Sequence, residues 1–196
     1  MEEIILVGYG GHAKSMVDAI ERSRQFHIAG YTDSRERDSE YVYLGTDEAL
    51  ENYLEKGIHN LALCIGYLGK GTIRERLYRN LKERGFSFPV IMDPSAVVSE
   101  RAVIGEGTFI GKKAVINSEA LIGKMCIINT AAVIEHECQV GDFSHISVGA
   151  VLCGQVRTGE AVFVGANATI IQCQEIEERE VVPAGMTVRS AGRKTG

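Results

Sequence analysis

Apolar residues recur at every sixth position from Met92 to Val188, and only Thr158 breaks their apolar character. Four residues after each of these positions the side chain is usually small, as at Ala96 and Ala132. Helices repeat at three to four residues and strands alternate at two, so a period of six indicates a short strand followed by a tight turn. This is the hexapeptide signature of a parallel β-helix.

Each hexad predicts a strand formed by the small residue, its neighbour and the next aliphatic residue, with the first and third pointing inward. A glycine often follows the aliphatic residue, as at Gly105 and Gly141, where a Cβ would clash at the corner. One coil cannot bury its apolar face alone, so neighbouring coils must stack. A β-sandwich with accidental spacing is the alternative, and the unbroken register of the hexads argues against it.

The first ninety residues carry a different pattern, in which short apolar runs alternate with helical stripes. The predicted strands span residues 3–7, 27–32, 61–65 and 88–92. One predicted helix runs to about Arg24, and a second, 72–84, has Ile73, Leu77 and Leu81 on one face and charges opposite. Alternating strands and helices predict a small parallel α/β sheet, half of a Rossmann-like unit. We therefore expect one domain over residues 1–90 and an all-β domain over 91–196.

The first predicted strand ends in a glycine-rich turn, Gly8-Tyr9-Gly10-Gly11-His12-Ala13, that fits G-x-G-x-x-G/A, and Asp33 follows the second strand. Glycine amides and a helix N-terminus can hold a diphosphate, and a carboxylate at the second strand can hold a ribose or base. Ninety residues supply too few strands for a full dinucleotide domain, so a nucleotide sugar is favoured over NAD. A purely structural turn is the remaining alternative, and His12 has either a phosphate-binding or a structural role.

Composition and charge exclude several classes of function. The chain has 196 residues and a net charge of −5, without a long basic cluster, which argues against nucleic-acid binding. The apolar run Ile4–Val7 is too short for a signal peptide or a membrane span. Five cysteines without metal-ligand spacing indicate a reduced, cytoplasmic protein with no metal site.

Two histidines, His136 and His145, lie at outward-facing positions of the repeat, where packing does not require an imidazole. If three hexads make one coil, residues eighteen apart stack, and Gly154 then lies over His136. A base beside a bare backbone N–H is the arrangement that acyl transfer needs. Either Glu135 or Glu137 would orient His136.

These residues also carry a family resemblance. The segment from Asn129 to Cys138, with Ile134-Glu135-His136-Glu137, followed by Gly141-Asp142-Phe143-Ser144-His145, resembles the core motif of the left-handed β-helix sugar O- and N-acetyltransferases. The bacillosamine-pathway UDP-4-amino-sugar N-acetyltransferases and the sialic-acid acetyltransferases are the most similar types. The glycine turn resembles the nucleotide-sugar turn of the same family, so the resemblance covers nearly the whole chain.

The resemblance implies a left-handed coil, a homotrimer with active sites in the clefts between subunits, acetyl-CoA as co-substrate and no metal. It implies that His136 is the general base and Glu137 its partner. It places the acetyl-CoA contacts at His145, Gly154 and Ala166. It places the contacts to the nucleotide-linked amino sugar at Gly10, Gly11, His12, Asp33 and Gly66.

The expected function is therefore acetyl-CoA-dependent N-acetylation of a nucleotide-linked amino sugar, with direct attack of the amine. O-acetylation of a sugar hydroxyl and non-catalytic binding of a nucleotide sugar are the alternatives. A zinc hydratase on this fold needs three converging histidines, and the repeat has two. Two departures are expected to affect the adenine end of the CoA site. Glu180 occupies an inward small position, and residues 189–196 lack the Gly-x-Pro-Ala segment usual in the family.

Overall fold

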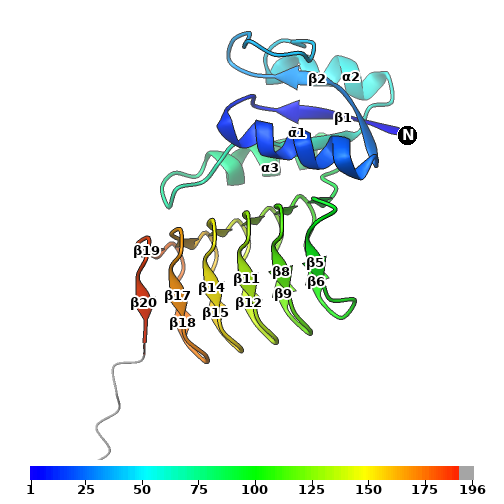
Figure 1. Cartoon of the computed structure of the whole chain (residues 1–196). Coiled ribbons are helices and arrows are strands. Elements are labelled where there is room, and N and C mark those ends of the chain that lie inside the picture. Colours follow the sequence, from blue (N-terminus) through cyan, green and yellow to red (C-terminus); the bar gives the residue numbers. More distant parts are fainter. Residues whose placement is uncertain (190–196) are drawn as a thin grey trace, which may run out of the picture.

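The computed structural model describes residues 1–189 and begins with a three-stranded parallel sheet flanked by helices (Figure 1). The strands are β1 (Glu2–Val7), β2 (Phe26–Thr32) and β3 (Asn60–Leu63), in the order β2-β1-β3. The helices are α1 (Gly11–Ser23), the short 3-10 helix η1 (Asp47–Ala49), α2 (Leu50–Glu55) and α3 (Ile73–Glu83). The last four residues of β1 are buried, as expected for a central strand covered on both faces.

The predicted elements of this unit are present, with three differences. The segment 47–55 forms η1 and α2, which the sequence pattern did not indicate. The predicted strand 88–92 is reduced to β4 (Ile91–Met92), the first strand of the coil. Arg74 in α3 is buried, although the charged residues of this helix were expected to face solvent.

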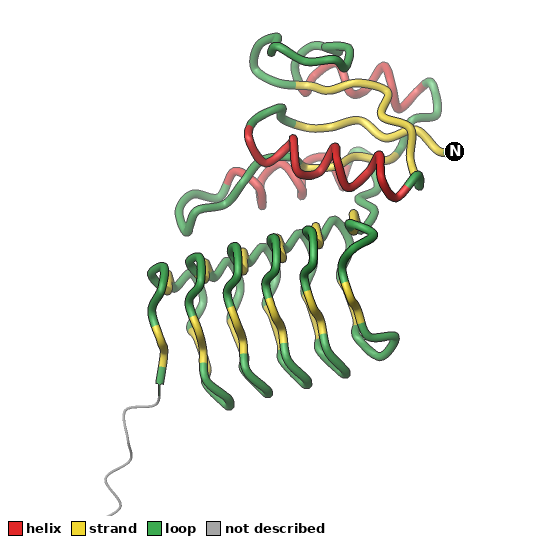
Figure 2. Tube along the Cα trace, viewed as in Figure 1, coloured by secondary structure: helices red, strands yellow, loops and turns green. Residues whose placement is uncertain are grey.

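The rest of the described chain is a parallel β-solenoid of two-residue strands that form three flat faces (Figure 2). The first face contains β4, β7 (Phe109–Ile110), β10 (Ile127–Ile128), β13 (His145–Ile146), β16 (Phe163–Val164) and β19 (Val181–Val182). The second contains β5 (Val97–Val98), β8 (Val115–Ile116), β11 (Val133–Ile134), β14 (Val151–Leu152), β17 (Thr169–Ile170) and β20 (Thr187–Val188). The third contains β6 (Val103–Ile104), β9 (Leu121–Ile122), β12 (Gln139–Val140), β15 (Arg157–Thr158) and β18 (Glu175–Ile176).

The register between coils is eighteen residues, which confirms three hexads per coil. Ile134 pairs with Leu152 on the second face, and Val140 pairs with Thr158 on the third. The aliphatic and small positions of the hexads form one buried column along the axis. Thr158, the polar exception, is buried, and its hydroxyl accepts a hydrogen bond from the backbone N–H of Gly141.

At the corners of the coil, one position allows close approach of the next coil and a nearby position adopts the left-handed conformation. The glycine after the aliphatic residue provides close approach, since a Cβ on Gly165, which follows Val164, would lie 2.4 Å from the backbone nitrogen of Ala184. The left-handed conformation lies two residues further on and is adopted mostly by other residue types, such as Lys113 (φ 55°) and Phe143 (φ 59°). The predicted Cβ clash is therefore present, but the turn itself is made elsewhere.

The final described coil is regular, contrary to the expected disturbance by Glu180. The carboxylate of Glu180 is exposed and accepts a hydrogen bond from the backbone N–H of Glu177, and its carbonyl accepts one from Phe163. The side chain leaves the inward position for solvent, so the Glu180 carboxylate is not buried in the coil. The other predicted departure is the missing Gly-x-Pro-Ala segment at residues 189–196. Of these, residues 190–196 lie outside the described residues.

The N-terminal unit lies along the side of the coil and spans several turns of it (Figure 1). Tyr67 donates its hydroxyl to the carbonyl of Ala161 at 2.6 Å, and Arg22 forms an ion pair with the buried Asp93 at 2.7 Å. One apolar cluster contains residues of both units, including Phe109 of the coil. Within residues 1–189 no helix has the length and apolar character needed to cross a membrane.

Candidate active site

A cavity of about 620 Å³ lies where the N-terminal unit meets the coil. Its walls come from the start of α1, the loop after β3, and the corners that follow β10 and β13. The lining residues are Gly11, His12, Ser15, Gly66, Tyr67, Leu68, Asn129, Thr130, His145 and Val148. The structure thus brings together four predicted site residues that are far apart in the sequence, namely Gly11, His12, Gly66 and His145.

His12 follows the glycine turn in the first turn of α1 and packs edge-on against Phe109, with ring centroids 5.2 Å apart. Its Nε2 atom is buried and has no hydrogen-bond partner among the described residues. Burial, followed by the nearby charges of Arg74 and His145, lowers the pKa of His12 to about 3. The ring is therefore neutral at physiological pH.

Arg74 is a buried cation whose charge acts on His12 and His145 of this cavity. Its guanidinium donates to the carbonyl oxygens of Ile65 and Leu63 at the end of β3 and, at 2.7 Å, to that of Met125 in the coil. Burial lowers its pKa to about 10, so it remains charged at neutral pH. Within residues 1–189 this guanidinium has carbonyl partners and no carboxylate partner, and such a positive charge makes the surroundings favourable for an anion.

His145 points away from the coil axis, as predicted, but the loop after β3 covers it and leaves it 6% exposed. Its Nδ1 lies 2.6 Å from the carbonyl oxygen of Tyr67, which can only accept, so Nδ1 carries the proton. Asn129 uses its Oδ1 to accept the backbone N–H of Thr130, which turns its amide nitrogen toward Nε2 of His145 at 3.1 Å. In this arrangement the neutral ring has no N–H left for an acetyl oxygen.

Asp33 lies beside the glycine turn rather than on the cavity wall. Its carboxylate accepts the backbone N–H of Tyr9 at 3.0 Å and pairs with Arg37 at 3.0 Å. Burial alone would raise the pKa of Asp33, but the hydrogen bonds from Arg37 and Tyr9 together lower it. Gly10 caps α1, and a Cβ at Gly10 or Gly11 would meet open space.

His136 lies at a different corner of the coil, between β11 and β12. Its imidazole is exposed, and Nδ1 is 2.9 Å from Oε2 of Glu137, so Glu137 is the carboxylate that pairs with the ring. The His136 carbonyl accepts the backbone N–H of Gln155 from the next coil, which confirms the predicted stacking. A Cβ on Gly154 would lie 2.6 Å from Nε2 of His136, so the bare glycine leaves room for this atom.

The predicted residues therefore form two groups at two corners of one chain. The second face of the coil separates the pair His136 and Glu137 from the corner that lines the cavity. Ala166 belongs to the cavity's corner, one coil beyond Val148, and is partly exposed there. A general base must come within about 3 Å of the proton that it removes, so one chain alone does not bring the groups into contact.

Tyr67, Arg74 and Asn129 are residues of this region that sequence reasoning missed. Asn129 belongs to the quoted motif and lies eighteen residues before Ser147, so coil stacking would have placed it near His145. Tyr67 lies in the loop after β3, which has no periodic pattern, and Arg74 occupies a charged position of α3 that the pattern assigned to solvent.

The lowered pKa of His12 predicts a pH-dependent stability. Between pH 6.5 and about 3 the unfolded chain binds a proton at this residue that the folded chain does not, so stability falls as the pH falls. His12→Gln is expected to reduce this dependence by about 1.4 kcal/mol per pH unit between pH 6 and 4. Urea unfolding at several pH values measures it, with the exposed His27→Gln as control. An unchanged slope in His12→Gln would contradict the assignment.

Comparison with known proteins identifies relatives for both parts of the chain. Residues 3–81 match the family model described as PglD N-terminal domain. The UDP-N-acetylbacillosamine N-acetyltransferase of Bacillus subtilis (strain 168) is 35% identical over 113 residues, which is 56% of this chain and 51% of that protein. The match thus spans about half the length of this curated relative.

Two solved structures resemble nearly the whole chain. A histidine-to-alanine variant of GDP-perosamine N-acetyltransferase from Caulobacter crescentus, in complex with CoA and GDP-perosamine, is 32% identical with a TM-score of 0.90, covering 96% of this chain and 89% of that chain. The acetyltransferase domain of PglB from Neisseria gonorrhoeae FA1090 is 29% identical with a TM-score of 0.89, covering 99% and 94%. The chain therefore belongs to the hexapeptide-repeat, left-handed β-helix family of sugar acetyltransferases.

Proposed function

We propose that this protein transfers the acetyl group of acetyl-CoA to the amino group of a nucleotide-linked sugar. The pairing of His136 Nδ1 with the Glu137 carboxylate carries the proposal, because it holds the proton on Nδ1 and leaves Nε2 as a free base. Two of the relatives named above support the substrate class, namely the UDP-N-acetylbacillosamine N-acetyltransferase and the GDP-perosamine N-acetyltransferase.

The proposed reaction is a direct transfer. The amine nitrogen attacks the thioester carbonyl and Nε2 of His136 takes a proton from the amine. The tetrahedral intermediate then collapses with cleavage of the C–S bond, and the imidazolium returns the proton to sulfur, so CoA leaves as the thiol and His136 is neutral again. The carboxylate of Glu137 stabilises the imidazolium that forms, and the Gly154 amide is the proposed donor to the oxyanion. In this proposal residues 1–90 bind the nucleotide sugar through Gly10, Gly11, His12, Gly66 and Asp33, and residues 91–196 bind acetyl-CoA.

The two groups at separate corners favour an active site shared between chains. We propose a homotrimer in which the His136 corner of one subunit faces the cavity corner of its neighbour, with His145 and Ala166 beside the acetyl-CoA. Closed rings of identical subunits place two different surface patches against each other at every interface. The arrangement would bring the base and the acceptor cavity into one cleft.

Release of free thiol from acetyl-CoA tests the reaction. We expect release with UDP- or GDP-linked 4-amino sugars and none with the matching 4-hydroxy sugars. Release with hydroxy sugars alone would make the protein an O-acetyltransferase, and binding of nucleotide sugar without thiol release would make it a binding protein.

Mixed oligomers test the shared site. His136→Ala removes the base, and Gly11→Trp fills the cavity at a position where a Cβ meets open space. In a one-to-one mixture of the two inactive chains, about one quarter of shared sites contain both intact groups, so about that share of activity should return. No recovery from co-assembled chains would place the site within a single subunit.

A further inference from the structure

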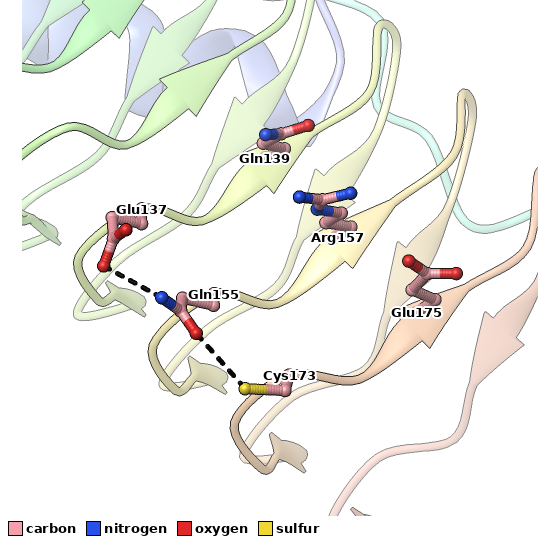
Figure 3. Close-up of a pocket in the computed structure, with 6 residues that line it drawn as sticks. All are labelled: Glu137, Gln139, Gln155, Arg157, Cys173 and Glu175. Carbon is pink, nitrogen blue, oxygen red and sulfur yellow. Dashed lines mark hydrogen bonds between the residues drawn. The ribbon is translucent and has the colours of Figure 1, made fainter.

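Three side chains form a polar ladder along the corner that carries His136. Glu137, Gln155 and Cys173 are eighteen residues apart, and all three adopt the left-handed conformation, with φ of 59°, 61° and 60°. The Gln155 amide donates to Oε2 of Glu137 at 3.2 Å, and the Cys173 thiol donates to Oε1 of Gln155 at 3.3 Å. Figure 3 shows the three side chains in a row along the edge of a groove of about 410 Å³.

The charges of the ladder fix the orientation of the Gln155 amide. A flipped amide would turn its oxygen toward the negative carboxylate of Glu137, which is unfavourable. The thiol of Cys173 supplies a donor to the oxygen on the other side. The Glu137 carboxylate at one end and the Cys173 thiol at the other therefore both favour the orientation with the NH₂ group of Gln155 toward Glu137.

The hydrogen bond from the Gln155 amide reaches the same carboxylate oxygen of Glu137 that pairs with the imidazole of His136. Oε2 of Glu137 lies 2.9 Å from Nδ1 of His136 and 3.2 Å from Nε2 of Gln155. The hydrogen bond from His136, and then that from Gln155, lower the pKa of Glu137. Because Glu137 is well exposed, the second bond adds little stability, and its main effect is to restrict the rotamers of the carboxylate.

We propose that Gln155 is a positioning residue that holds Glu137 in the rotamer required to keep the proton of His136 on Nδ1. The inference rests on the proposed function of His136 as the base. Without the amide, the exposed carboxylate rotates, the Nδ1–H tautomer loses its partner, and a larger share of the rings carries the proton on Nε2. Such rings cannot accept a proton from the substrate.

The kinetic test compares Gln155→Met in the wild-type and Glu137→Gln backgrounds. Methionine keeps the length and lack of branching but removes the amide. We expect Gln155→Met to lower kcat about five- to tenfold, with the KM for acetyl-CoA unchanged. The partners that orient metal-binding histidines typically contribute about tenfold or more, and a base has a similar need for a fixed ring tautomer. In Glu137→Gln the same substitution should cost less than about twofold, since the carboxylate that it positions is absent.

Gln139→Met is the matched control, because Gln139 lines the same groove and its side chain lies away from Glu137 (Figure 3). It should leave kcat near the wild-type value. An equal loss from Gln155→Met in both backgrounds would overturn the inference, since the residue would then act independently of Glu137. A wild-type kcat in Gln155→Met would overturn it as well.

The tautomer of His136 is a readout that needs no substrate. Nitrogen NMR of the neutral histidine ring should show the proton mainly on Nδ1 in wild type and Gln139→Met, and shared between both nitrogens in Gln155→Met. An unchanged tautomer in Gln155→Met would overturn the inference. The proposed function fails separately if His136→Ala keeps its activity. If His136→Ala is inactive while Gln155→Met keeps the wild-type kcat and tautomer, only the role of Gln155 is rejected.

Discussion

His136→Ala is expected to lower kcat about 100- to 10,000-fold, the usual contribution of a general base. The side chain of His136 is 58% exposed, so its removal creates no cavity in the coil and should leave the fold and the oligomer intact. Steady-state thiol release under saturating acetyl-CoA measures the loss. Because the imidazole acts on the amine during attack, we expect the KM for acetyl-CoA to change little.

The matched control is His27→Ala, because His27 is also exposed but lies on β2, away from the coil. It should retain the wild-type rate. Size-exclusion chromatography and thermal unfolding should show the same assembly for both variants. If an intact His136→Ala oligomer loses less than about tenfold in kcat, His136 is not the base and the direct mechanism proposed above is wrong.

The period of six predicts most of the coil because each hexad repeats one local conformation. The aliphatic residue fixes the inward direction and the small residue fits beside it, so Ile134 and Ala132 are both fully buried, as expected. The segment 47–55 has no comparable regularity, and its short helices depend on packing against the sheet, as the burial of Leu50 shows. Local periodicity therefore predicts repeated elements and misses those that tertiary contacts stabilise.

The same limit applies to the candidate site. Stacking at eighteen residues predicts that Gly154 lies over His136, and extending it by one position would have revealed Gln155 beside Glu137. The covering of His145 by Tyr67 is different, because it depends on how the N-terminal unit lies on the coil. Contacts within the coil follow from its register, whereas contacts between the two units do not.

Gly154→Ala is expected to lower kcat about 100-fold, although it adds only one methyl group. The new Cβ would lie 2.6 Å from Nε2 of His136, closer than nonbonded atoms approach, so the imidazole must move away. A displacement of about 1 Å in a reacting group typically costs about 100-fold in rate. The φ of Gly154 lies outside the left-handed region, so the substitution adds no backbone strain and the coil should remain as stable as the wild type.

The double variant His136→Ala with Gly154→Ala separates this clash from any other effect of the methyl group. Without the imidazole the Cβ at position 154 no longer meets Nε2, so the second substitution should cost less than about twofold in the residual rate. A similar 100-fold loss in both backgrounds would show that the methyl group obstructs acetyl-CoA or its oxyanion rather than His136. In that case the bare backbone of Gly154 is needed at the thioester itself, and the space that it leaves for the base is secondary.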